Sequence, residues 1–469
     1  MPIPGMPTRA IPTKMRRHGN VLDLIGGTPV VRLARFDTGP CELYAKLESQ
    51  NPGGSIKDRI GLRMIEAAER DGKLRAGGTI VEATAGNTGL GLALTAIHKG
   101  YRLLLVIPDK MSQEKIFHLR AMGAEIVLTR SDVGKGHPAY YQDMAKRICS
   151  ETPGAFYIDQ FSNPANPRTH ETWTAPEIWE QMEHRLDAVV CGVGTGGTLS
   201  GIGRFMKRAA PHVEMVLADP EGSVLADIVT TGTHGEAGSW LIEGIGEDFV
   251  PPNCDLGLVH RAYTIPDAES LLTARELLKR EGIFAGSSAG TLLAAALRYC
   301  REQTRPKRVV TIVPDAGGKY LSKMFNDYWL MDQGILAREA RGDLTDLIAR
   351  RHAERATVSI GADDMLMTAL GRMKLYDFQQ LPVLEGERVV GIIDESDILI
   401  AVYDDPGRFR EPVREAMTSR LETLQAREPV DALLPIFDRG RVAIIMDGEQ
   451  FLGLITRYDL LNYLRRRAR

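Results

Sequence analysis

The chain has 469 residues, 43% of them hydrophobic and 25% charged, which is the composition of an ordinary globular protein with more than one domain. Its 58 Lys and Arg residues nearly balance 61 Asp and Glu residues, so charge gives no reason to expect a nucleic acid or an anionic membrane as a partner. Five dispersed cysteines suit a reducing compartment, and the ten histidines show no metal-ligand spacing. We expect a cytoplasmic protein without a structural metal.

The first 20 residues are rich in proline and basic side chains but lack an apolar core, so we expect an extended arm and neither a signal peptide nor a membrane span. From residue 21 to about 330, short apolar runs alternate with helical patterns. This alternation predicts an α/β fold whose parallel sheet is covered on both faces. The runs that we expect to form buried strands lie at residues 79–83, 101–108, 124–129, 186–194, 213–220 and 308–315.

Two similar units follow a change in composition after Trp329. Both are predicted to run helix, strand, strand, helix, and they end in the matching stretches GIIDESDIL and GLITRYDLL. An internal repeat of this kind predicts a paired α+β module. We expect the α/β domain at residues 21–335, a charged, helix-prone connector at 336–353, and the module at 354–469, with repeats at about 354–402 and 412–469.

The stretch NPGGSIKDR places a lysine, Lys57, in the first turn of a predicted helix. Ser55 followed by Asp58 has the order of a capping box, with Asp in place of Glu. A cation at this position opposes the helix dipole, at a cost of about 0.3–1 kcal/mol, unless it points into water. Taken alone, the stretch therefore indicates a solvated surface lysine.

A glycine-rich turn, CGVGTGGTLSGIG, follows the expected strand at residues 186–190. Its backbone N–H groups and the start of the next helix form a cradle suited to phosphate. Gly192, Gly194 and Gly197 also match the Gly-x-Gly-x-x-Gly pattern of dinucleotide sites, and Asp219 is placed for a ribose contact. A purely structural turn is the third interpretation, and the turn alone does not decide among the three.

Three further turns carry polar residues near expected helix starts or strand ends. Residues 84–88 supply hydroxyls, an amide and free N–H groups that suit a carboxylate, although Asn87 would also serve as a helix cap. Ser287 and Ser288 open an apolar helix, where one serine can cap the helix and the other can hydrogen-bond a ligand ring. Asp315 follows the last strand, at the edge where ligands gather in open α/β sheets.

A lysine at a helix start and a phosphate cradle in one α/β body together indicate pyridoxal phosphate, which binds through a lysine Schiff base. The helix dipole would lower the pKa of Lys57 and leave more free amine for this bond and for proton transfer. The motifs NPGGSIKDR, TAGNTG, GTGGT and GSSAG occur in this order. With them, residues 21–330 resemble the fold-type II pyridoxal-phosphate enzymes of the cysteine synthase and cystathionine β-synthase family. The paired C-terminal repeats resemble the Bateman module of tandem CBS motifs that cystathionine β-synthases carry.

The resemblance implies a role for each matching residue. Lys57 would be the Schiff-base lysine and the acid–base group, Asn87 would bind the ring hydroxyl, and Ser288 would bind the pyridine nitrogen. The phosphate would be held by Gly194, Thr195, Gly196, Gly197 and Thr198, the substrate carboxylate by Thr84, Gly86, Thr88 and Gln160, and the second substrate by Glu243.

The implied reaction is the β-replacement of transsulfuration, in which L-serine loses its hydroxyl and L-homocysteine adds to give L-cystathionine, with hydrogen sulfide production as a side reaction. Ala85 and Phe161 stand where relatives carry hydroxyls, so O-acetylserine and sulfide, the substrates of cysteine synthases, stay as an alternative. Glu243 favours homocysteine, since cysteine synthases usually have glutamine there.

Two further implications concern function and cofactors. An alternative of another class is a non-catalytic sensor of adenosyl nucleotides that has kept the fold. No haem is expected, because no cysteine precedes Cys41, and His18 is interpreted as a surface residue.

The Bateman resemblance implies an adenosyl ligand, S-adenosylmethionine, between the repeats. Thr456 and Asp459 in GLITRYDLL match the ribose-binding positions, and Phe378 is counted with them. In the first repeat Asp394 replaces the hydroxyl, so that cleft is expected to be impaired. Helix capping by Thr456 and Asp459, in a module that only packs and oligomerises, is the alternative. The resemblance also implies a homodimer or homotetramer.

Overall fold

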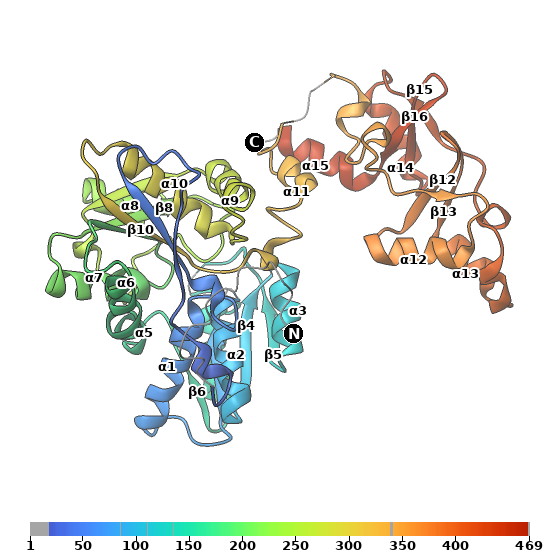
Figure 1. Cartoon of the computed structure of the whole chain (residues 1–469). Coiled ribbons are helices and arrows are strands. Elements are labelled where there is room, and N and C mark those ends of the chain that lie inside the picture. The colour runs from blue at the N-terminus through green and yellow to red at the C-terminus, as the bar shows by residue number, and fades with distance from the viewer. Residues whose placement is uncertain (1–17, 85, 110, 135, 338–340, 468–469) are drawn as a thin grey trace, which may run out of the picture. The chain divides into compact units, whose positions relative to one another are not determined.

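The computed structural model describes residues 18–84, 86–109, 111–134, 136–337 and 341–467 (Figure 1). Contacts between Cα atoms divide the chain into two compact units, Met1–Phe325 and Asn326–Arg469. His18, predicted to lie on the surface, is exposed. No helix among the described residues is long and apolar enough to cross a membrane.

Two sheets form the framework of the first unit. The larger sheet has the strand order β1-β2-β10-β7-β8-β9, and within it only β1 runs antiparallel to its neighbour. The smaller sheet, in the order β5-β4-β3-β6, is parallel throughout. The strands are β1 (Val30–Arg32), β2 (Glu42–Leu47), β3 (Thr79–Ala83), β4 (Arg102–Pro108), β5 (Glu125–Thr129), β6 (Ala155–Tyr157), β7 (Ala188–Cys191), β8 (Glu214–Pro220), β9 (Arg261–Ile265) and β10 (Arg308–Val313).

Burial explains why the apolar runs of the sequence form these strands. Every residue of β3 and of β7 is buried, as expected of central strands in a sheet that helices cover on both faces. Each of the six predicted runs contains one strand, and the predicted α/β class is confirmed. The strands are divided between one fully parallel sheet and one sheet that is parallel except at β1. Four strands of the first unit are additions to the predicted set, namely β1, β2, β6 and β9.

Helices lie around both sheets (Figure 1). Two of them, α1 and α2, approach so closely that a Cβ on Gly91 of α2 would lie 2.5 Å from the backbone oxygen of Lys57 in α1. The helices are α1 (Lys57–Arg70), α2 (Asn87–Lys99), α3 (Gln113–Ala121), α4 (Tyr141–Glu151), α5 (Ala165–Thr169), a π-helical turn (His170–Thr174), α6 (Ala175–Gln181), α7 (Gly197–Ala209), α8 (Leu225–Thr231), α9 (Asp267–Glu281) and α10 (Ser287–Arg301).

The predicted capping box at the start of α1 is wrong in its pairing. Ile56 is the N-cap residue and makes no side-chain cap, while the Ser55 hydroxyl accepts a long bond from the Lys57 N–H at 3.3 Å. The Asp58 carboxylate turns back and accepts a hydrogen bond from the Gly53 N–H at 2.6 Å. Glycine makes this possible, since a Cβ on Gly53 would lie 2.5 Å from Asp58 Oδ1.

The second unit contains two three-stranded sheets of matching topology, each with one parallel and one antiparallel pair. Its N-terminal helix α11 contacts α15, where Arg466 pairs with Asp332 at 3.2 Å. The elements are α11 (Asp327–Asp332), β11 (Ile360–Gly361), α12 (Leu366–Tyr376), β12 (Gln380–Glu385), β13 (Arg388–Asp394), α13 (Glu395–Val402), β14 (Thr423–Gln425), α14 (Leu434–Asp438), β15 (Ala443–Asp447), β16 (Gln450–Ile455) and α15 (Arg457–Arg467).

The connector before the repeats differs from the predicted helix. Over residues 341–356 it forms two short 3₁₀ turns, Leu344–Asp346 and His352–Glu354. Leu344, Leu347 and Ile348 are buried in the core of the second repeat. Packing against that core therefore decides the backbone here, in place of the helix propensity of the charged residues.

Candidate active site

Loops far apart in the sequence meet where parallel strands of the first unit end. Ser55, just before Lys57, forms an isolated bridge with Asp315 after β10, and Ala316 forms another with Ala285 before α10. The Asn87 amide, at the start of α2 beside the smaller sheet, donates to Asp315 Oδ2 at 2.7 Å. These contacts bring together the beginnings of α1, α2 and α10, as expected at the carboxyl edge of α/β sheets.

Lys57 begins α1, and its side chain is partly exposed. Burial of the surrounding region lowers the pKa of the Lys57 ammonium to about 8, although Asp315 and Glu247 act in the opposite direction. The sequence argument attributed such a shift to the helix dipole, but in the structure desolvation is the largest cause. A pKa of about 8 corresponds to roughly one tenth uncharged amine at pH 7.

The Asn87 side chain is held on both sides. Its Oδ1 accepts a hydrogen bond from Lys319 Nζ at 2.9 Å, and its Nδ2 donates to Asp315. Asp315 Oδ2 also accepts from the Tyr320 hydroxyl at 2.6 Å. Lys319 and Tyr320 were not among the predicted site residues, although both belong to the PDAGGKYLSK stretch that follows β10.

The glycine turn before α7 forms a tight loop with no acidic side chain in its sequence. Gly196 has φ +82°, and a Cβ on Gly197 would lie 1.9 Å from Asn166 Oδ1. Asn166 Nδ2 donates to Thr195 Oγ1 at 2.9 Å, so the Thr195 hydroxyl hydrogen stays available to another acceptor. The first N–H groups of the 13-residue helix α7 have no side-chain cap at Gly196. Residues 194–198 therefore suit an anion such as phosphate.

The dinucleotide interpretation of the glycine turn needs Asp219 to bind a ribose, and the structure argues against this contact. Asp219 lies at the end of β8 as predicted, but it is fully buried and its Oδ2 accepts from the Ala226 N–H at 2.9 Å. The carboxylate thus holds the start of α8 and is not available to a ribose.

The residues predicted to grip the substrate carboxylate lie together. Thr88 Oγ1 donates to Gln160 Oε1 at 2.6 Å, and Gln160 Nε2 donates to the Ala83 carbonyl at 3.0 Å. The Gly86 N–H donates to Thr84 Oγ1 at 3.1 Å, which leaves the Thr84 hydroxyl hydrogen for a ligand. Ala85, whose missing hydroxyl was noted in the sequence, lies outside the described residues.

Glu243 lies in a buried charged cluster that the sequence did not predict. Its carboxylate pairs with Lys115 Nζ at 2.5 Å and with Lys323 Nζ at 2.7 Å. Burial acts to raise the pKa of Glu243, but the two lysines outweigh it and keep the pKa below its usual range. Lys115 also donates to the Tyr320 hydroxyl at 3.1 Å, so the cluster is linked through Tyr320 to Asp315.

Ser288, predicted to meet a ligand ring, is buried in the first turn of α10. Its neighbour Ser287 is occupied, because its hydroxyl accepts a hydrogen bond from the Glu243 N–H at 3.1 Å. Gly286 is the N-cap residue of α10 and the helix has no side-chain cap, so the expected capping serine is not found, and the contact of Ser288 with a ligand ring stays a prediction.

The predicted regulatory residues of the second unit are engaged with neighbours. Thr456 Oγ1 donates to Asp459 Oδ2 at 2.6 Å, and Asp394 and Asp397 form a reciprocal capping box at the start of α13. Phe378 packs under the Arg350 guanidinium, 4.4 Å from the ring centre. The structure therefore contains the helix-capping arrangement that was the alternative for Thr456 and Asp459.

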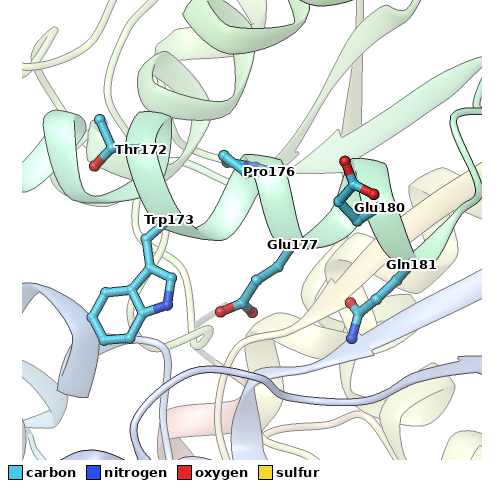
Figure 2. A pocket seen from close by; sticks show the side chains of 6 residues that line it. All are labelled: Thr172, Trp173, Pro176, Glu177, Glu180 and Gln181. Atoms are coloured by element: carbon cyan, nitrogen blue, oxygen red, sulfur yellow. The ribbon is translucent and has the colours of Figure 1, made fainter.

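A hollow in the first unit contains none of the predicted site residues. It is lined by Thr172, Trp173, Pro176, Glu177, Glu180 and Gln181 (Figure 2). Trp173, Glu177 and Gln181 project from one side of this helical stretch. Glu177 and Gln181 bind the buried ammonium of Lys46 at 2.9 and 2.7 Å.

Comparison of the sequence with known protein families assigns the chain to a class of enzyme. The family model described as pyridoxal-phosphate dependent enzyme matches residues 21–315, and the CBS domain model matches residues 350–404 and 413–466. The chain therefore belongs to the pyridoxal-phosphate-dependent enzyme family and carries two CBS domains after its catalytic part. This assignment confirms the predicted fold-type II fold, the tandem CBS module and pyridoxal phosphate as the cofactor.

Curated relatives narrow the class to enzymes of β-replacement. Cystathionine beta-synthase of Dictyostelium discoideum is 36% identical over 459 residues, which cover 95% of this chain and 92% of the relative. Its namesake from Saccharomyces cerevisiae is 33% identical and covers 96% of this chain and 98% of the relative. Cysteine synthase of Staphylococcus aureus is 43% identical and covers 65% of this chain and 95% of the relative. The protein is thus a pyridoxal-phosphate enzyme that catalyses β-replacement.

A solved structure supports the same class. The O-acetylserine dependent cystathionine beta-synthase from Helicobacter pylori superposes with a TM-score of 0.60 and is 37% identical, covering 66% of this chain and 99% of that structure.

The residues of the site fit pyridoxal phosphate. The loop at residues 194–198 offers hydroxyls and N–H groups to a phosphate, and the hydrogen bond from Asn166 Nδ2 to Thr195 Oγ1 leaves the Thr195 hydroxyl hydrogen available for it. Lys57 supplies an amine of lowered pKa, and Asn87 and Ser288 supply neutral polar groups. The combination matches the needs of the phosphate, aldehyde and ring of this cofactor.

Proposed function

We propose that this enzyme joins L-serine to L-homocysteine and forms L-cystathionine. The observation that carries the choice of second substrate is the Glu243 cluster, in which one carboxylate pairs with Lys115 and Lys323. Homocysteine carries an ammonium and a carboxylate that such a cluster can recognise, whereas sulfide has neither. Relatives named cystathionine beta-synthase that match over 95% and 96% of the chain support the same choice.

Pyridoxal phosphate, when bound, supplies an electron-withdrawing ring that stabilises negative charge at the α-carbon of an attached amino acid. Lys57 would attach the cofactor and move the α-proton, because its lowered pKa raises the share of free amine near neutral pH by roughly two orders of magnitude over an ordinary lysine. The Thr195 and Thr198 hydroxyls and the N–H groups of residues 194–198 would hold the phosphate.

The same reasoning gives the chain's residues their roles toward the amino-acid substrate. The Thr84 hydroxyl and the N–H groups that begin α2 would bind its carboxylate. Thr88 would hold Gln160 in place through their 2.6 Å hydrogen bond. Ser288 would meet the ring nitrogen as a neutral partner, which favours elimination over reactions that need a long-lived carbanion.

The attachment point is tested by reduction and peptide mapping. Treatment of the cofactor-loaded chain with borohydride should fix the cofactor on the peptide that contains Lys57, and Lys57→Ala should lose both this modification and turnover by at least about 10³-fold. Lys115 and Lys319 are the internal controls, since both are buried lysines of the same network. Modification of either one in the wild type, or full activity of Lys57→Ala, would contradict the assignment.

The substrate pair is tested by measuring kcat/KM for homocysteine and for sulfide, each with serine and with O-acetylserine. We expect the highest value for serine with homocysteine. Glu243→Gln should raise the KM for homocysteine about tenfold and leave that for sulfide nearly unchanged, since only homocysteine offers an ammonium to the Glu243 carboxylate.

O-acetylserine and sulfide form the second candidate pair, and one observation favours it. Phe161, which has no hydroxyl, is buried with its ring centre 6.0 Å from that of Phe249. Without a hydroxyl at position 161, no side chain there can hydrogen-bond the departing hydroxyl of serine. The acetate of O-acetylserine is a better leaving group and needs no such help. A higher kcat/KM with O-acetylserine and sulfide than with serine and homocysteine would decide for cysteine synthesis.

For the CBS domains we propose an adenosyl ligand in the second repeat, near Thr456 and Asp459. S-adenosylmethionine should bind in a calorimetric titration, and Thr456→Ala should weaken this binding. Absence of heat with the wild type would leave the two residues as a helix cap alone. Tight nucleotide binding with no turnover on any substrate pair would favour a sensor without catalysis. The homo-oligomer and the cytoplasmic location stay predictions.

A further inference from the structure

The amide of Asn87 is held by two charged side chains of opposite sign. Lys319 Nζ donates to its Oδ1 at 2.9 Å, and its Nδ2 donates to Asp315 Oδ2 at 2.7 Å. These two contacts fix which end of the amide carries oxygen. An ammonium can only donate, and Asp315 Oδ2 already accepts a hydrogen from Tyr320. A flipped amide would put N–H groups against Lys319 and an oxygen against Asp315.

Lys319 has no spare hydrogen for another role. It lies in the 3₁₀ turn Gly317–Tyr320 and is 7% exposed. Its ammonium donates to the carbonyls of Gly53 and Gly54, at 3.2 and 3.1 Å, as well as to Asn87. Three donors therefore meet three acceptors. Lys319 thereby links the loop that precedes Lys57 to the residue that begins α2.

One N–H of Asn87 remains after these contacts. The side-chain amide has two N–H donors, and Asp315 takes one of them. Contact between a cation and the amide oxygen polarises the amide, which strengthens the remaining N–H as a donor. A polarised donor of fixed direction suits an acceptor that carries negative charge.

We propose that Lys319 and Asp315 are positioning residues that hold the Asn87 amide in one orientation and present its remaining N–H to the ring hydroxyl of pyridoxal phosphate. The inference rests on the proposed contact between Asn87 and the cofactor and adds to it the two side chains that act through Asn87. Neither of them needs to touch the cofactor.

Cofactor affinity provides a test that does not depend on turnover. The cofactor is removed from the full-length chain and titrated back into the wild type, Lys319→Met, Asn87→Ala and the double variant, with the dissociation constant and the absorbance spectrum as readouts. We expect Lys319→Met to raise the dissociation constant about tenfold, which is the effect of losing one charge-assisted hydrogen bond. In the Asn87→Ala background the same change should raise it by less than about threefold, because its target is gone.

Two further variants separate positioning from stability. Lys319→Arg keeps a cationic donor and should lose less affinity than Lys319→Met, although its planar guanidinium meets the three acceptors in a different geometry. Lys46→Met is the matched control, since Lys46 is also buried and also makes three hydrogen bonds, to Thr28, Glu177 and Gln181. It should lower the melting temperature without changing the dissociation constant or the spectrum.

The outcomes distinguish the positioning role from the contact beneath it. An Asn87→Ala chain that binds the cofactor like the wild type would overturn the proposed contact and the positioning role with it. If Asn87→Ala weakens binding but Lys319→Met acts equally in both backgrounds, or not at all, the positioning role alone is overturned. An equal loss of affinity in Lys46→Met would overturn it too, because general destabilisation would then explain the effect.

Discussion

Buried charge surrounds the first turn of α1. Asp58, the residue after Lys57, is fully buried, and its Oδ1 has no hydrogen-bond partner. Burial raises the pKa of Asp58 to about 7, while the Gly53 N–H and Lys319 act against the rise. A carboxyl whose pKa is raised on folding binds its proton more tightly in the native state, so its contribution to stability falls as pH rises from about 4 to about 7.

The raised pKa of Asp58 predicts how the stability of Asp58→Asn depends on pH. The variant removes the titration but keeps an oxygen that can accept from the Gly53 N–H. The free energy of unfolding of the variant minus that of the wild type should increase from pH 5 to pH 8, by on the order of 2 kcal/mol. Denaturant unfolding of the full chain at several pH values measures this difference. Asp71→Asn, at an exposed position at the end of α1, is the control and should show no such trend. A difference that is constant with pH would contradict the assignment of the raised pKa.

At the scale of elements, the close contact between α1 and α2 holds Lys57 in place. Gly61 of α1 and Gly91 of α2 face each other, and a Cβ on Gly61 would lie 2.5 Å from the Gly91 carbonyl carbon. Both helices begin with predicted site residues, Lys57 and Asn87. The distance between these two side chains therefore depends on how closely the helix backbones approach.

Gly91→Ala should disturb the site through this contact. The added methyl would meet the Lys57 backbone, so we expect destabilisation of about 1–3 kcal/mol together with weaker cofactor binding. Gly371→Ala in α12 is the matched control, because no atom lies within 4 Å of its Cβ position. It should leave the first unit unchanged and stabilise its own helix by up to about 1 kcal/mol. Unchanged stability and cofactor affinity in Gly91→Ala would show that the helices can move apart freely.

At the scale of the whole molecule, the chemistry belongs to one of the two units. Every residue proposed to contact the cofactor or the substrates lies before Phe325, where the first unit ends. The helix α11 that follows contacts α15 and belongs to the second unit. The cysteine synthase relative matches 65% of the chain, which shows that proteins without the second unit exist in this family.

A chain that ends at Phe325 should therefore bind pyridoxal phosphate with a dissociation constant within about threefold of that of the full chain. Any effect of S-adenosylmethionine on activity should disappear with the second unit. Cofactor titration and a rate assay of both chains provide the measurement. A loss of cofactor affinity beyond about tenfold would mean that the second unit completes the site.

Much of the fold was predictable because the governing interactions are local or periodic. Residues 79–83, for example, include Ile80, Val81 and Ala83, and every residue of the strand is buried. A strand buried on both faces needs such apolar residues, so the run could be recognised in the sequence. The connector at residues 341–356 was mispredicted as helical, since its three apolar residues fold onto the second repeat and propensity gives way to that burial.

The sequence by itself determined the α/β class and the repeated module, because both depend on residue types at fixed spacing along the chain. The roles of Lys57, Asn87, Ser288 and the glycine loop came from the family resemblance of the motifs and stay predictions. Only the tertiary structure decided that Asp58 turns back to Gly53, that Asp219 is used inside the fold, and that Lys319 and Asp315 hold Asn87. These contacts join residues whose separation is set by how the two sheets and their helices pack. The pKa of Lys57 belongs with them, since desolvation by distant parts of the chain, more than the local helix start, lowers it to about 8.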